Sequence, residues 1–82
     1  MGTERKVKGC VVRCPNTGKQ GVIADTPDER GHAYIKWLEG YEAHTRNVRY
    51  YMERVDVRML TEVASVTDAG LNALKWKVIR GL

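Results

Sequence analysis

Short runs of apolar residues alternate with polar breaks over most of the chain, and within the runs the spacing is two residues. The clearest case is the segment 32–38, in which Ala33, Ile35 and Trp37 alternate with more polar neighbours. Successive side chains of a β-strand point to opposite faces, so this period of two predicts a strand with one buried face.

Other segments repeat this pattern. Val55, Val57 and Met59 predict a further strand, and the polar, β-prone stretch 44–51 precedes it. Residues 7–26 form two β-rich runs separated by Pro-Asn-Thr-Gly at 15–18, a composition typical of a hairpin turn. A second polar break covers residues 26–31. The pattern thus predicts five short strands.

The period changes near the C-terminus. Apolar residues recur there at spacings of three and four, which predicts a helix over about residues 67–80. Ser65 or Thr67 is expected to cap it, with Asp68 in its first turn. The apolar stripe is formed by Leu71, Leu74, Val78 and Leu82.

Several glycines and apolar residues of the first half share the spacing of a known family. The set is Gly9, Val12, Cys14, Gly18, Gly21, Ile23, Gly31 and Ile35. It resembles the KOW-type pattern of SH3-like barrels in ribosomal proteins and transcription-elongation factors, over about residues 8–37. The acidic pair at 28–29 and the C-terminal helix depart from that pattern.

The resemblance implies a mainly β fold, a five-stranded SH3-like small barrel at about 7–60 with an added C-terminal α-helix, within a single domain of residues 1–82. Such folds need glycine where the first hairpin turns tightly, because a Cβ would clash at positive φ or at close strand approach, and Gly18 and Gly21 fit that need. The family often binds RNA or proteins. The side chains expected to point inward are Val12, Cys14, Ile23, Ala33, Ile35, Val55 and Val57.

Composition and charge favour a small binding module. The chain has 82 residues, 43% of them hydrophobic, and a formal net charge of +4. Five bases against one acid in residues 1–19, and three against one in 63–82, make both ends basic. Because no apolar run approaches the roughly 20 residues of a membrane span, and the N-terminus lacks the apolar core of a signal peptide, we expect a cytoplasmic protein without a membrane partner.

Catalytic and metal chemistry find little support. His32 and His44 have no nucleophile or paired carboxylate at a recognisable spacing, so we expect a non-catalytic protein without a cofactor. Cys10 and Cys14 lie roughly 13 Å apart if they share one strand. That separation is too large for one zinc ion or for a disulfide, and it favours two reduced thiols.

Tyrosines and basic residues in the middle of the chain suggest a nucleic-acid surface. On adjacent strands they could stack bases and pair with phosphates, as single-strand binders do. A protein interface, a plain solvated face, and an aromatic cage for a cation built from Tyr34, Trp37, Tyr41, Tyr50 and Tyr51 remain alternatives. The residues expected to contact RNA or single-stranded DNA are Lys8, Lys19, Tyr34, Lys36, Arg46, Arg49, Tyr50 and Tyr51.

Trp76 lies off the apolar stripe of the predicted helix. It falls about 140° from Leu71, which places it at the surface unless helix and sheet pack differently and bury it. An exposed Trp beside bases is typical of a binding hot spot. The alternative function is therefore a protein-interaction adaptor, self-associating or bound to another protein, whose C-terminal helix makes the contact through Trp76, Lys77 and Arg80.

Overall fold

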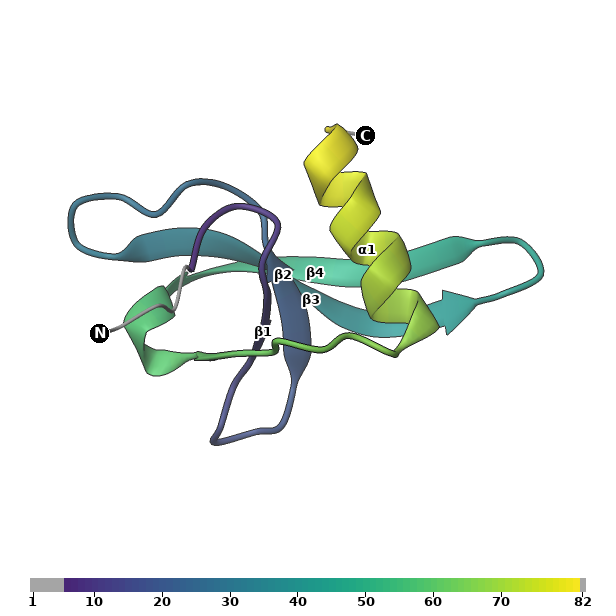
Figure 1. The fold of residues 1–82 in the computed structure, drawn as a ribbon, viewed down its shortest axis with the longest axis horizontal. Helices are drawn as coiled ribbons and strands as arrows, with labels where there is room; N and C mark the ends of the chain where they lie inside the picture. The colour runs from purple at the N-terminus through teal and green to yellow at the C-terminus, as the bar shows by residue number, and fades with distance from the viewer. Residues whose placement is uncertain (1–5, 82) are drawn as a thin grey trace.

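The fold is one antiparallel sheet with a helix packed on it, in a computed structural model that describes residues 6–81 (Figure 1). The strands follow the order β4-β3-β2-β1-β5 across the sheet. The elements are β1 (Val11–Arg13), β2 (Gln20–Ile23), β3 (His32–Glu42), β4 (Asn47–Asp56), the 3₁₀ helix η1 (Val57–Met59), β5 (Thr61–Glu62) and α1 (Ala69–Arg80). The prediction of a mainly β chain with five strands and a C-terminal helix is confirmed.

The sheet is not closed into a barrel. In the part of the chain that the structure describes, β4 pairs only with β3 and β5 pairs only with β1, so these two strands form the edges. The predicted strand over 55–59 is wrong in its second half, because Val57–Met59 form η1. The Asp56 carboxylate accepts a hydrogen bond from the Arg58 amide and so caps this turn, which ends the extended backbone of β4.

The first core lies on one face of the bent sheet. Its buried members are Val12, Ile23, Ala33, Ile35, Trp37, Val57 and Leu60, and Cys10, Cys14, Tyr51 and Val55 pack against them. Every side chain that the sequence predicted to point inward belongs to this cluster. The alternation along β3 therefore identified one face of the sheet correctly.

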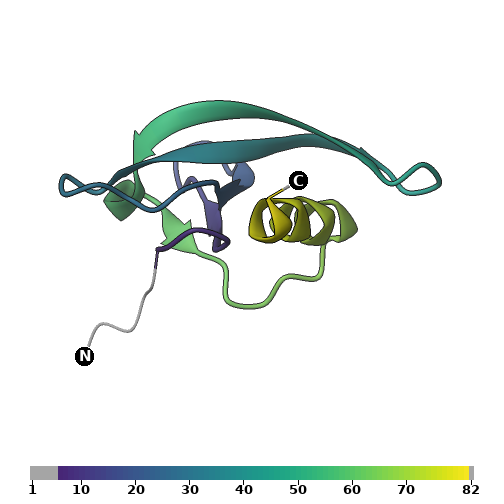
Figure 2. The same cartoon turned by 90° about the horizontal axis from the view of Figure 1, so that it is seen from above.

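A second core lies on the opposite face, beneath α1 (Figure 2). Leu71, Leu74 and Val78 of the helix are buried there against Val11 and Val22. These three confirm the predicted apolar stripe, whereas Leu82 lies outside the described residues. Successive residues of β1 and β2 are thus buried on both faces, which is why these short strands read as continuous apolar runs.

The helix begins at a different cap from the one that the sequence predicted. Asp68, rather than Ser65 or Thr67, is the N-cap, and its carboxylate accepts hydrogen bonds from the amides of Gly70 and Leu71. Gly81 ends the helix in the left-handed conformation, with φ 72°. Within residues 6–81 no helix has the length and apolarity that crossing a bilayer requires.

Two glycines of the first hairpin have the roles that the sequence predicted. Gly18 has φ +77° in the turn before β2. Gly21 has no room for a side chain, since a Cβ there would lie 2.5 Å from the backbone oxygen of Lys36 and 3.0 Å from Trp37 Cα. The first glycine permits the turn and the second permits the close approach of β2 and β3.

We predict that Gly21→Ala costs more stability than Gly18→Ala. The first change forces backbone apart beside the buried Trp37, at about 1–3 kcal/mol or more. The second meets open space and costs only the left-handed strain of about 1–2 kcal/mol. Urea denaturation of both variants tests the order, and equal midpoints would contradict the packing of β2 on β3.

Candidate functional site

The expected Tyr/Arg surface is divided between the two faces of the β3–β4 hairpin. Tyr51 lies opposite Trp37 on the side of the first core, whereas Tyr50 lies opposite Leu38 on the side of α1. Adjacent residues of a strand point to opposite faces, so the two tyrosines cannot act on one ligand surface.

On the side of α1, Lys36 and Tyr50 form a contact. The Lys36 ammonium lies 4.8 Å from the centroid of the Tyr50 ring, a cation–π distance. Tyr34 is exposed on the same face, opposite Arg54, whose guanidinium pairs with the Asp28 carboxylate at 2.5 Å. Arg54 is therefore neutralised within the chain.

On the opposite side, Lys19 is bound to Tyr51. Its Nζ donates a 2.6 Å hydrogen bond to the Tyr51 hydroxyl and lies 5.1 Å from the ring centroid. That hydrogen bond raises the pKa of the Lys19 ammonium. Arg49 lies over Gly40, its partner residue across the hairpin, and Lys8 is exposed in the turn before β1. These residues do not converge on one site.

One groove does collect basic and aromatic side chains, and it lies between α1 and the start of β4. It has a volume of about 390 Å³ and is lined by Arg46, Val48, Ala73, Trp76, Lys77 and Arg80. No acidic residue is among the lining residues. The fold therefore brings together Arg46, expected at a nucleic-acid surface, and the three helix residues expected at a protein interface.

Trp76 is the one aromatic residue among those that line this groove, and its side chain is 53% exposed. The Arg80 guanidinium lies 5.7 Å from its ring centroid. Arg46 enters from the β3–β4 turn with φ 57°, a left-handed conformation that only tight turns normally impose on a side-chain-bearing residue. The sequence left Trp76 either exposed or buried between helix and sheet, and in the structure it is exposed.

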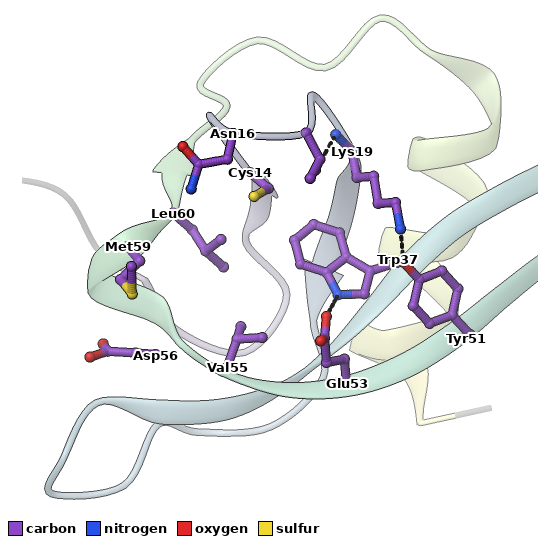
Figure 3. Close-up of a pocket in the computed structure, with 11 residues that line it drawn as sticks. Cys14, Asn16, Lys19, Trp37, Tyr51, Glu53, Val55, Asp56, Met59 and Leu60 are labelled. Atoms are coloured by element: carbon purple, nitrogen blue, oxygen red, sulfur yellow. Dashed lines mark hydrogen bonds between the residues drawn. The ribbon is translucent and has the colours of Figure 1, made fainter.

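A second pocket, of about 330 Å³, opens beside the first core (Figure 3). The Trp37 indole donates a 3.0 Å hydrogen bond to Glu53, and the Lys19–Tyr51 contact lies at the rim. Asp56, also in the lining, has its pKa lowered to about 2 by the Arg58 guanidinium that it binds. The charged side chains of this lining, Lys19, Glu53 and Asp56, are therefore each bound within the chain, and the sequence pattern did not predict this pocket.

Cys14 is a half-buried member of this second pocket. Hydrogen bonds from the Thr17 hydroxyl and from the backbone amides of Thr17 and Asn16 lower the pKa of its thiol. The amides converge because the turn 14–17 closes with Gly18 N–H donating to the Cys14 carbonyl at 2.8 Å. Thiolate stabilisation of this kind increases reactivity toward electrophiles.

Neither cysteine is in a disulfide. In residues 6–81, no three His, Cys, Asp or Glu side chains lie close enough together to hold a metal ion. Comparisons of the chain with family models, curated proteins and solved structures give no match.

We predict that Thr17→Val raises the pKa of the Cys14 thiol, because it removes the hydroxyl hydrogen bond to the thiolate. In a Cys10→Ala background, where Cys14 is the remaining thiol, alkylation by iodoacetamide near neutral pH should slow by a few-fold. The rate measured across pH should shift its midpoint upward. Thr45→Val, in the distant β3–β4 turn, is the matched control, and identical pH profiles for both variants would show that Thr17 does not bind the thiolate.

Proposed function

We propose that this chain is a small non-catalytic module that binds single-stranded nucleic acid in the groove between α1 and β4. The observation that carries the proposal is the lining of that groove, in which three basic side chains and an exposed tryptophan meet without an acidic side chain. Single-strand binders combine these two elements, a positive groove for the backbone and an aromatic ring for the bases.

Each lining residue has a defined part in this proposal. The indole of Trp76 offers a flat surface on which any base can stack, and stacking contributes about 1–3 kcal/mol for each base. Arg46 and Lys77 approach from opposite walls, the β3–β4 turn and the helix, so phosphates on both sides of a stacked base have a partner. Arg80 keeps a positive charge beside the indole ring.

The proposal narrows the set of contact residues. Arg46 stays within it, joined by Trp76, Lys77 and Arg80. The other expected contacts lie outside the groove, and Lys19 and Lys36 already bind tyrosines. A contribution of the exposed Lys8, Tyr34 and Arg49 to a longer binding path remains a prediction.

The fold type and compartment expected from the sequence are part of the same proposal. An SH3-like small barrel is supported by the bent sheet around the first core, by the return of β5 to β1, and by the 3₁₀ turn between β4 and β5. A KOW-type relationship and a cytoplasmic location are proposed on the sequence pattern alone.

A protein-binding role is the second candidate, and one observation favours it. Ile79 is 47% exposed on the same helix as Trp76, so α1 presents two large apolar side chains to solvent. Such residues dominate the energetics of protein interfaces. Salt separates the two candidates, because phosphate contacts weaken steeply as counterions compete, whereas an apolar interface responds little.

We predict that a labelled single-stranded oligonucleotide quenches the fluorescence of Trp76 at low salt. The second tryptophan, Trp37, is only 2% exposed and should contribute an unchanged signal. If the three basic side chains of the groove each contact one phosphate, a plot of the logarithm of affinity against the logarithm of salt concentration should have a slope of about −2. Absence of binding at low salt would refute the nucleic-acid proposal.

Variants test whether the groove is the binding site. Lys77→Ala should reduce affinity and bring the salt slope toward zero by about 0.7, since one phosphate contact is lost. Lys75→Ala removes the same charge from the same helix outside the groove lining and is the control. Equal effects of the two variants would show that net charge, rather than the groove, determines binding.

A further inference from the structure

Within residues 6–81, the strand β4 forms a long edge of the sheet, with β3 on one side and no strand on the other. It runs for 10 residues, whereas the strand at the other edge, β5, has 2. In Figure 2 no other ribbon lies beyond β4, and among the described residues it pairs only with β3. An exposed edge of this length presents a row of unpaired amide and carbonyl groups, which is a template for another strand.

The register shows which of these groups point away from the sheet. The amide of Ala24 donates to the carbonyl of Tyr34 at 2.8 Å, so even-numbered residues of β3 face β2 and odd-numbered ones face β4. The amide of Val57 likewise donates to Gly31 at 2.8 Å, which continues the odd-numbered series. Tyr51, Glu53 and Val55 therefore bond to β3, and Tyr50, Met52 and Arg54 direct their backbone groups outward.

We propose that β4 pairs antiparallel with β4 of a second copy of this chain, around a two-fold axis at Tyr51. Tyr50 of each copy then lies opposite Met52 of the other. Each of these two pairs forms two N–H···O hydrogen bonds between the backbone groups that point away from β3. The two five-stranded sheets join into one continuous sheet. Homodimers of this kind use one surface patch twice.

The side chains at this edge are complementary in the proposed register. Arg49 lies opposite Glu53 of the second copy, once on each side of the axis; Glu53 Oε1 accepts from the Trp37 indole of its own chain, so Oε2 is the oxygen that meets the guanidinium. These pairs are not hydrogen-bonded through their backbones, so their side chains approach most closely. On the face of α1, Met52, which is 51% exposed, meets the Tyr50 ring of the second copy.

Neighbouring registers lack this complementarity. The outward backbone groups all belong to even-numbered residues, and these must lie opposite one another in the two copies. The two-fold axis therefore passes through a residue of β4 and never between two residues. An axis at Glu53 places two glutamates opposite each other, and an axis at Arg49 places two arginines opposite each other; both arrangements are destabilising. Axes at Tyr50 or Met52 separate Arg49 from Glu53. Charge thus selects the axis at Tyr51.

Met52→Pro tests the pairing in the intact chain. Proline removes an amide that points outward and that β3 does not use, so it is compatible with the folded edge strand but not with a paired one. We expect sedimentation velocity of the unaltered chain to show a monomer–dimer equilibrium, with dimerisation weakened about tenfold or more by Met52→Pro. Met52→Leu keeps the amide and an apolar side chain and should still dimerise.

A charge exchange tests the register, and it does not depend on the fold of the proline variant. Arg49→Glu should weaken dimerisation about tenfold, because two glutamates then lie opposite each other on each side of the axis. Adding Glu53→Arg in the same chain should restore it. Far-ultraviolet circular dichroism checks that the variants remain folded.

Three outcomes would overturn the proposal. They are a chain that stays monomeric up to millimolar concentration, a dimer that Met52→Pro leaves unchanged, and a charge exchange that fails to restore the Arg49→Glu defect. None of them bears on the nucleic-acid groove, whose residues lie off the β4 edge or point toward α1.

Discussion

The pairing of β3 with β4 is the constraint on which the rest of the structure depends. The 11-residue β3 contributes to both cores, since Ile35 and Trp37 are buried in the first core while the half-buried Leu38 and Tyr41 pack against the second. A register shift of one residue would move each of these side chains to the wrong face. The irregularity in pairing between Leu38 and Gly40 adds one residue to β3. It places Tyr41 on the same face as Leu38, against the second core.

Docking of α1 on this sheet creates the groove that we propose as the ligand surface. The buried stripe of the helix packs mainly on β2 and β3 and touches the start of β4 at Val48, and the remaining helix surface then faces solvent next to the β3–β4 turn. Trp76 and Lys77 reach the groove only because Leu74 and Val78 set the rotation of the helix. A domain of this size has little spare core, so a shallow groove at the joint of helix and sheet is the site that its architecture allows.

The second pocket differs from the groove in how its charged side chains are paired. Its charged and polar groups are paired internally, Lys19 with Tyr51, Glu53 with Trp37 and Asp56 with Arg58. A ligand would have to compete with these contacts, whereas the α1–β4 groove contains bases without acidic partners in its lining. Internal pairing is therefore the physical reason why the proposal places nucleic-acid binding in the groove rather than beside the first core.

The sequence by itself determined the elements whose signal is local. The period of two in 32–38, the turn at 15–18 and the helical stripe from Leu71 to Val78 identified the strands, the first hairpin and the helix, because steric alternation and turn geometry act between near neighbours. Only the tertiary structure decided the open edges of the sheet, the side of the sheet on which α1 packs, and the meeting of Arg46 with Trp76. Those features depend on strand pairing and helix docking between residues far apart in the chain. A local pattern of side chains does not say which distant segments come together.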